Sequence, residues 1–208
     1  MQNTKPALLP SKPRLWFAIL LLAIAAALGL YTWNAALVNQ TVSGVALIGG
    51  PFEMVNQNGN KVTEKDFAGK PMLLFFGYTY CPDVCPTELQ IMSTTLDQLG
   101  DQAKNVQPVF VTIDPERDTP AVLKNYLDSF GPRWTGLTGT PDQVRNIARV
   151  WHVFYEKRDN KDAPTDYLMD HSSFIFLMGP DGKFIKHFNY TTDSKAFGEA
   201  LSEALKIG

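Results

Sequence analysis

The two cysteines of this 208-residue chain are its best candidates for chemistry. Cys81 and Cys85 lie four positions apart in the segment YTYCPDVCPTE, residues 78–88. If a helix begins near Cys81, both side chains lie on one helical face, with about 6 Å of rise between them. This separation permits either a disulfide bond or the binding of one soft metal ion by two thiolates. The free N–H groups and dipole of a helix N-terminus favour thiolates and lower the pKa of such cysteines.

Two thiolates are an incomplete ligand set for most metals, and three histidines are available to complete it. His152 ends a predicted helix and His187 alternates within a predicted strand, so we expect both to be structural. His171 lies in the polar stretch DYLMDHSS before an apolar strand, where a loop could reach the cysteines. His171 is therefore the candidate third ligand, although a lone histidine is more often structural than a ligand. The competing interpretation is a structural disulfide, which stabilises little when it closes so short a loop.

Three acidic residues are candidates to support this site. Asp114 and Asp118 lie four positions apart in DPERDTP, residues 114–120. Asp118 could cap a helix and Asp114 could begin a turn, or both could dock a partner or support the cysteine loop. Asp170 adjoins His171, and it could accept a hydrogen bond from the histidine ring or simply be solvated.

The apolar pattern predicts the elements that position these residues. A buried strand over 71–77 leads directly into the cysteine segment. Further strands are predicted at 52–55 and 61–63, around an Asn-Gly turn, and at 106–113, 134–137, 173–178 and 183–188. Helices are predicted at 86–99, 119–130, 140–151 and 193–206, with Thr119 and Thr140 as N-caps. This order predicts an α/β domain with a mixed central sheet flanked by helices.

The N-terminal quarter has a different pattern of charge. After Lys5, Lys12 and Arg14, no charged residue occurs until Glu53. Within this gap, residues 15–33 read LWFAILLLAIAAALGLYTW, which has the length and composition of a transmembrane helix. A cleavable signal peptide is the alternative, and it would also export the rest of the chain.

These features predict four parts in the chain. Residues 1–14 form a cytoplasmic N-terminus, residues 15–33 a single transmembrane helix, residues 34–50 a linker, and residues 51–208 the folded domain. An Arg-rich, Ser-rich presequence is absent from the sequence ahead of this helix. We therefore expect a bacterial inner-membrane protein whose soluble domain lies in the periplasm, an oxidising compartment.

The overall composition excludes several classes of protein. With 45% hydrophobic and 19% charged residues, the chain is neither collagen, nor a coiled coil, nor wholly disordered. Its net charge of −2 lacks the positive field that nucleic-acid binding requires, so nucleic acid is not an expected partner. Two cysteines cannot form a disulfide framework or a four-cysteine zinc site.

Four motifs occur in a defined order along the chain: GGPFEMVNQNG at 49–59, CPDVCP at 81–86, DPERDTP at 114–120, and Asp170-His171-Ser172. Together they resemble the Sco/SenC family of membrane-anchored copper proteins. The resemblance implies a thioredoxin-like fold and copper bound by Cys81, Cys85 and His171. It also implies that the protein is a metallochaperone more than an enzyme. Such a chaperone would deliver copper to the copper A site of cytochrome c oxidase subunit II during assembly. A periplasmic copper donor and a thiol reductant are further expected partners.

Two alternatives stay open beside copper delivery. Soft thiolates suit Cu(I) and imidazole also suits Cu(II), so the implied ligands could hold either oxidation state. A thiol-disulfide oxidoreductase would instead use Cys81 and Cys85 without metal, on the cysteines of that copper site or on other exported proteins. The C-x3-C spacing, and the absence of a proline before the strand at 173–178, count against it. A redox or copper sensor is the third interpretation, which the sequence does not separate from a carrier.

Overall fold

The computed structural model describes residues 12–40, 48–158, 166–189 and 194–207, with the backbone alone at 12–15, 33–40 and 207. Contacts within the chain divide it into two units, Met1–Ala46 and Leu47–Gly208. The second unit thus begins a few residues before the predicted start of the folded domain at residue 51.

The described part of the first unit is one helix, α1 (Lys12–Gln40). It is longer than the helix predicted over 15–33, because it includes residues 34–40 of the predicted linker. This stretch, NAALVNQ, contains no glycine or proline to end a helix, and alanine and leucine favour one. Residues 34–40 are therefore helical rather than part of the linker.

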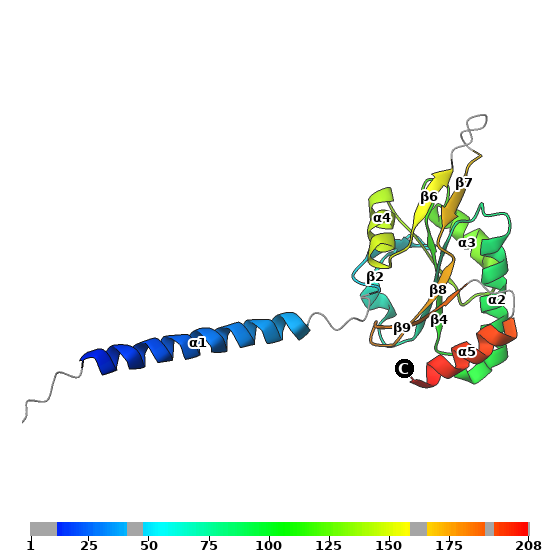
Figure 1. Cartoon of the computed structure of the whole chain (residues 1–208). Helices are drawn as coiled ribbons and strands as arrows, with labels where there is room; N and C mark the ends of the chain where they lie inside the picture. Colours follow the sequence, from blue (N-terminus) through cyan, green and yellow to red (C-terminus); the bar gives the residue numbers. More distant parts are fainter. Residues whose placement is uncertain (1–11, 41–47, 159–165, 190–193, 208) are drawn as a thin grey trace, which may run out of the picture. The chain divides into compact units, whose positions relative to one another are not determined.

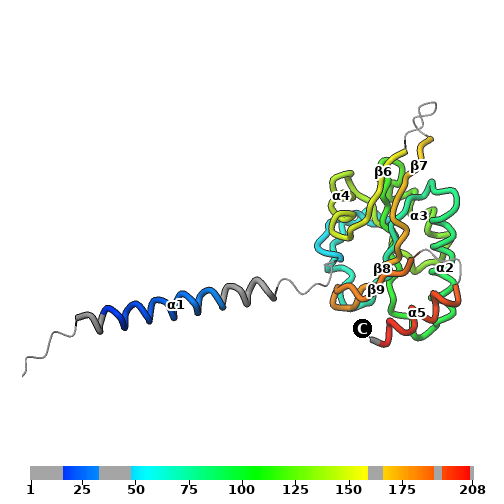
Figure 2. The backbone as a smooth tube through the Cα atoms, in the orientation of Figure 1, coloured from blue at the N-terminus to red at the C-terminus, as the bar shows by residue number. Residues whose placement is uncertain are grey.

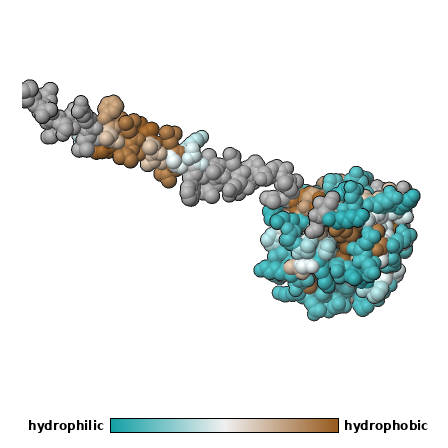
Figure 3. Space-filling view, turned by 90° about the horizontal axis from the view of Figure 1, so that it is seen from below, coloured by the Kyte–Doolittle hydropathy of each residue, from teal (hydrophilic) through white to brown (hydrophobic). Residues whose placement is uncertain are grey.

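The side chains of residues 16–32 are exposed, and those visible in the space-filling view are mainly hydrophobic (Figure 3). Over the described residues, no helix was found with both the length and the apolarity needed to cross a membrane. Residues 1–11 of the predicted cytoplasmic segment and residues 41–47 of the predicted linker lie outside the described residues, as do the side chains at 15 and 33.

Seven strands form the central sheet of the second unit: β1 (Glu53–Asn56), β2 (Lys61–Thr63), β3 (Met72–Gly77), β4 (Gln107–Thr112), β5 (Thr135–Thr138), β8 (Phe174–Met178) and β9 (Phe184–Asn189). Their order across the sheet is β2-β1-β5-β4-β3-β8-β9 (Figure 1). The central strands β5, β4 and β3 are parallel, whereas the outer strands pair antiparallel. The mixed sheet confirms the predicted α/β architecture.

Helices cover both faces of this sheet. α2 (Val84–Leu99), α3 (Pro120–Asp128) and α5 (Ser194–Ile207) lie on one side, and α4 (Pro141–Val150) lies on the other (Figures 1 and 2). Every residue of β3 is buried, as expected for a parallel strand between two layers. Its Phe75 ring packs on Phe110, while the adjacent Phe76 ring packs on Trp151, which follows α4. Neighbouring residues of β3 thus point to opposite faces of the sheet.

The helix starts largely follow the predicted caps. Thr119 Oγ1 accepts the N–H of Val122, and Thr140 Oγ1 accepts the N–H of Gln143, so both predicted N-caps are confirmed. α2 begins at Val84, earlier than its predicted start at residue 86. Two short 3-10 helices, η1 (Glu64–Phe67) and η2 (Gly100–Gln102), are also present.

A separate two-stranded sheet was not predicted. It consists of β6 (Tyr155–Arg158) and β7 (Leu168–His171), which pair antiparallel. The sequences YEKR and LMDH give no apolar run: half of these eight side chains are exposed and only Met169 is buried, and the strands are held by pairing with each other. His171 is consequently the last residue of a strand rather than part of the loop expected from the sequence.

Ser93 holds α2 against the end of α3 and the start of β5. Its hydroxyl donates to the carbonyl oxygen of Phe130 at 2.9 Å and accepts the Trp134 indole N–H at 2.8 Å. Both Ser93 and Trp134 are buried, so this relay replaces hydrogen bonds to water.

We expect Ser93→Ala to lower the free energy of unfolding by about 1–3 kcal/mol, because it leaves two buried polar groups unpaired. Urea unfolding of the variant and the parent measures this loss. Thr94→Ala is the matched control on the same helix, since the Thr94 hydroxyl accepts a hydrogen bond from the exposed Gln90 side chain, and it should change stability by less than about 0.5 kcal/mol. Equal stabilities for both variants would contradict the relay.

Candidate metal centre

Cys81 and Cys85 lie where β3 ends and α2 begins. The Cys81 N–H donates to the carbonyl oxygen of Tyr78 at 3.3 Å, which turns the chain away from the strand. Pro82 follows and disfavours a helical backbone at Cys81. Cys81 therefore precedes α2 and only Cys85 lies in its first turn, which corrects the expectation of a helix that begins near Cys81.

Both cysteines are free thiols, so they do not form the structural disulfide that the sequence left open. Cys85 is fully buried, whereas Cys81 is half-buried. The backbone N–H of Cys85 donates to Cys81 Sγ at 3.4 Å. The start of α2 thus directs a free N–H group at this sulfur, as helix N-termini do for anions.

The two cysteines differ in their acidity. A hydrogen bond from the Cys85 thiol lowers the pKa of Cys81 to about 3, helped by the backbone N–H groups of Cys85 and Asp83, against the effect of partial burial. The pKa of Cys85 is raised, because its thiol donates to Cys81 and lies in a buried site. The pair therefore carries one negative charge at neutral pH, on Cys81.

His171 faces Cys85. Its Nε2 lies 3.6 Å from Cys85 Sγ, and its Nδ1 lies 3.0 Å from the carbonyl oxygen of Ser172. A carbonyl oxygen only accepts, so Nδ1 carries the proton in the neutral ring and Nε2 keeps a free lone pair. The rings of Phe75 and Tyr78 pack edge-on against the imidazole and fix its plane.

The spacing of these atoms suits a shared metal ion. Zinc, for comparison, binds sulfur at about 2.3 Å and nitrogen at about 2.0 Å, which puts two such ligands about 3.6 Å apart at a tetrahedral angle. The contact between Cys85 and His171 has this length. Within the described residues, no group of three His, Cys, Asp or Glu side chains is arranged to hold a metal ion, so sharing one would require Cys81 Sγ to turn toward the other two atoms. A cavity of about 330 Å³ beside Cys81 and His171 leaves room for this movement.

Gly77 makes space for the buried sulfur. A Cβ atom at this position would lie 2.9 Å from Cys85 Sγ, 2.9 Å from Phe110 and 3.0 Å from Phe75. These separations are shorter than van der Waals contact. The last residue of β3 thus has to be glycine for Cys85 to lie where it does.

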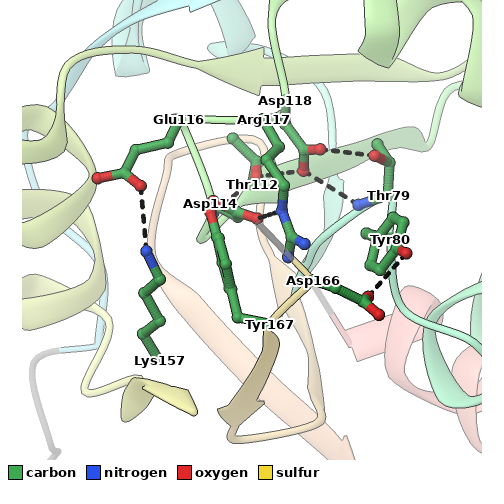
Figure 4. Close-up of polar contacts among 10 residues, drawn as sticks. All are labelled: Thr79, Tyr80, Thr112, Asp114, Glu116, Arg117, Asp118, Lys157, Asp166 and Tyr167. Carbon is green, nitrogen blue, oxygen red and sulfur yellow. Dashed lines mark hydrogen bonds and ion pairs between the residues drawn. The ribbon is translucent and has the colours of Figure 1, made fainter. Parts of the chain in front are cut away.

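Asp118 ties the cysteine loop to the sheet from within the domain (Figure 4). Its carboxylate accepts hydrogen bonds from the Thr79 N–H at 3.0 Å, the Thr79 hydroxyl at 2.6 Å and the Thr112 hydroxyl at 2.6 Å. Burial raises the pKa of Asp118, whereas these bonds favour its charged form. The N-cap of α3 is Thr119, so the predicted capping role of Asp118 is wrong. Its side chain instead bonds Thr79, which lies 39 positions earlier in the sequence, and no local sequence pattern indicates such a contact.

Asp114 lies in the turn expected for it. Its carbonyl oxygen accepts the N–H of Asp118 at 2.9 Å, and its carboxylate accepts the Arg117 Nε–H at 2.5 Å and the Tyr167 hydroxyl at 2.7 Å. Asp114 and Asp118 are both buried. Neither carboxylate is therefore exposed for the docking of a partner, and both are placed to support the loops around the site.

Asp170 does not contact the histidine ring. It forms an ion pair with Arg158 across the β6–β7 pair, while His171 Nδ1 bonds the Ser172 carbonyl instead. The other two histidines lie elsewhere: His152 follows α4, and His187 lies on β9. The structure thus brings together Cys81, Cys85 and His171, with Asp114 and Asp118 behind them.

Three residues that shape the site were missed from the sequence. Gly77 had a usable signal, since a glycine at the end of an apolar strand often marks a close approach. Ser172 acts through its backbone carbonyl, which leaves no trace in side-chain patterns. Arg117 stands between Asp114 and Asp118 in DPERDTP, where a predicted turn had already explained the motif.

We expect iodoacetamide to alkylate Cys81 at nearly the same rate at about pH 5 and about pH 8, because its pKa of about 3 keeps it ionised throughout. An ordinary cysteine slows roughly tenfold for each pH unit below its pKa of about 8.5. Mass spectrometry of the modified peptide follows the rate. Cys81→Ser is the control, since it leaves only the buried Cys85. A tenfold slope in the parent would contradict the lowered pKa.

We expect Gly77→Ala to lower the free energy of unfolding by about 1–3 kcal/mol, because the added methyl group overlaps Cys85 Sγ and two aromatic rings. Denaturant unfolding measures the effect. Gly198→Ala is the control, since a Cβ there meets its nearest neighbour, Thr95, at 3.5 Å, and alanine favours the α5 helix. A Gly77→Ala protein as stable as Gly198→Ala would show that the sulfur is not confined by this residue.

Comparison with known proteins agrees with this site. The chain matches the SCO1/SenC family model over residues 40–206. It is 41% identical over 159 residues to "Protein SCO1 homolog 1, mitochondrial" of Arabidopsis thaliana, a match that covers 75% of this chain and 47% of the relative. It is 42% identical over 154 residues to the "SCO2-like protein" of Rickettsia felis, covering 74% of this chain and 75% of the relative. The chain thus spans about half the length of the Arabidopsis relative.

Three solved structures with copper bound have the same fold. Arabidopsis thaliana ScoI superposes with a TM-score of 0.73 at 37% identity, covering 77% of this chain and 99% of that one. Bradyrhizobium japonicum ScoI gives 0.68 at 45% identity, with 76% and 99% covered. Yeast Sco1 gives 0.71 at 41% identity, with 76% and 88% covered. The fold is thioredoxin-like, and this chain belongs to the SCO1/SenC family.

Proposed function

We propose that this chain is a copper chaperone that binds one copper ion through Cys81, Cys85 and His171. The main support for this proposal is the 3.6 Å distance between Cys85 Sγ and His171 Nε2. The Ser172 carbonyl accepts from the other ring nitrogen, Nδ1, so the lone pair of Nε2 is available to a metal ion. The ionised Cys81 lies next to this pair and supplies negative charge. Relatives from Arabidopsis, Bradyrhizobium and yeast have been solved with copper bound.

The ligand set suits a carrier that handles two oxidation states. Two soft thiolates are sufficient for Cu(I), whereas Cu(II) gains from the imidazole of His171. The half-buried Cys81 stands at the open side of the site, next to the cavity. An acceptor's thiolate can enter there before the donor ligands leave. The acceptor that fits this chemistry is the copper A site of cytochrome c oxidase subunit II, during assembly of that enzyme.

The same proposal includes a membrane anchor. Residues 15–33 form an apolar stretch of transmembrane length, preceded by three basic residues. We place this anchor in a bacterial inner membrane, with residues 51–208 in the periplasm. A copper donor there would load the site, and a thiol reductant would keep both cysteines reduced.

A thiol-disulfide oxidoreductase is the second candidate. One observation favours it: an accessible cysteine with a lowered pKa beside a buried one with a raised pKa is the pattern of an attacking and a resolving thiol. His171 has no necessary part in that chemistry. A redox or copper sensor would use the same residues without transfer.

We expect the reduced full-length protein to bind one copper ion, with a thiolate-to-Cu(II) charge-transfer band in the visible spectrum. His171→Ala should weaken Cu(II) binding at least about tenfold, since changes even in groups around a metal ligand reduce affinity this much. Cu(I) binding should persist through the two thiolates. His187→Ala is the control, because His187 lies on β9 outside the site.

An unchanged Cu(II) spectrum in His171→Ala would contradict the three-ligand site. If the reduced parent binds no copper and its cysteines exchange readily with small disulfides, copper delivery is wrong and the oxidoreductase is favoured.

A further inference from the structure

The metal ligands lie on two segments that no sheet joins directly. Cys81 and Cys85 follow β3, whereas His171 ends β7, which pairs only with β6 among the described strands. Pairing of β3 with β8, which begins three residues after His171, brings the two segments together. Side-chain contacts between β7 and the loop after β3 add to this pairing. One such contact is the hydrogen bond from the Tyr80 hydroxyl to Asp166, at 2.9 Å.

Arg117 makes a further contact between the same two segments. Its guanidinium carbon lies 3.6 Å from the centroid of the Tyr167 ring and 4.6 Å from that of Tyr80. Figure 4 shows the guanidinium group between these two rings. Tyr80 precedes Cys81 directly, and Tyr167 directly precedes β7. One cation thus stacks on both ligand-bearing segments.

A buried carboxylate fixes Arg117 in this place. Asp114, which is 3% exposed, accepts the Arg117 Nε–H and the Tyr167 hydroxyl. The two terminal nitrogens of Arg117 are buried and have no hydrogen-bond partner among the described residues. The guanidinium group therefore makes its remaining contacts through its two flat faces, which stack on aromatic rings. Such stacking needs a planar group.

We propose that Arg117 is a positioning residue of the metal centre, which sets the distance between His171 and the two cysteines. This inference rests on the proposed copper site. Because both cysteines lie on one segment, a shift of β7 leaves the two thiolates together and moves only the imidazole. Loss of Arg117 should then weaken Cu(II) binding more than Cu(I) binding.

Copper titrations of the full-length protein in detergent test this selectivity. We expect Arg117→Met to weaken Cu(II) binding at least about tenfold and to shift the charge-transfer band, with Cu(I) affinity within about threefold of the parent. Arg117→Lys keeps the charge beside Asp114 but not the planar stack, so it should show the same selectivity while preserving thermal stability better. Tyr80→Leu should act in the same direction, and Tyr80 is exposed, so its replacement does not endanger folding.

Arg133→Met is the matched control. Arg133 is also partly buried, has a terminal nitrogen without a hydrogen-bond partner among the described residues, and lies just before β5. It should leave both copper affinities unchanged. If Arg117→Met weakens Cu(I) and Cu(II) binding equally, in proportion to a loss of thermal stability, Arg117 is only structural and the inference is wrong. Unchanged affinities for both ions would also overturn it.

A measurement without copper separates this inference from the proposed function. In nuclear magnetic resonance spectra of the reduced protein, Arg117→Met should shift the imidazole signals of His171, and Arg133→Met should not. If the parent binds no copper, the proposed function fails, yet these signals still test the positioning role. Unshifted His171 signals would contradict it.

Discussion

The contact between Cys85 Sγ and His171 Nε2 is the interaction on which the site depends, because it joins residues 86 positions apart. Pairing of β3 with β8 brings the chain that follows His171 beside the strand that leads to the cysteines. Gly77 leaves the volume that the sulfur fills, and the Ser172 carbonyl turns the imidazole toward it. Each of these features belongs to the backbone or to the absence of a side chain, so the contact is set by the fold.

Charge at the site is balanced in a way that suits a carrier. Two thiolates side by side in a buried place would repel each other, and the protonated Cys85 avoids this by donating to Cys81. If copper binds as proposed, it would displace the Cys85 proton and compensate the second negative charge, which would couple binding and release of the metal to one proton. The buried acids Asp114 and Asp118 hold the surrounding loops in place.

Much of the fold could be predicted because its central strands are buried on both faces and read as apolar runs, as in MLLFFG of β3. The helix caps at Thr119 and Thr140 could also be predicted, because each bonds an N–H group only three residues later. The β6–β7 pair could not be predicted, since its residues are mostly polar and hold each other by backbone pairing. Asp118 was misread for a related reason: capping is a local rule, whereas its bonds to Thr79 cross 39 positions. Contacts between distant segments are what sequence patterns do not contain.

X-ray absorption at the copper edge of the copper-loaded, full-length protein tests the central claim most directly, because it reports the atoms bound to the metal. We predict that the Cu(II) form has two sulfur ligands at about 2.3 Å and at least one imidazole nitrogen at about 2.0 Å. A copper shell that lacks sulfur, or that holds sulfur without any imidazole nitrogen in the Cu(II) form, would contradict a site made by Cys81, Cys85 and His171.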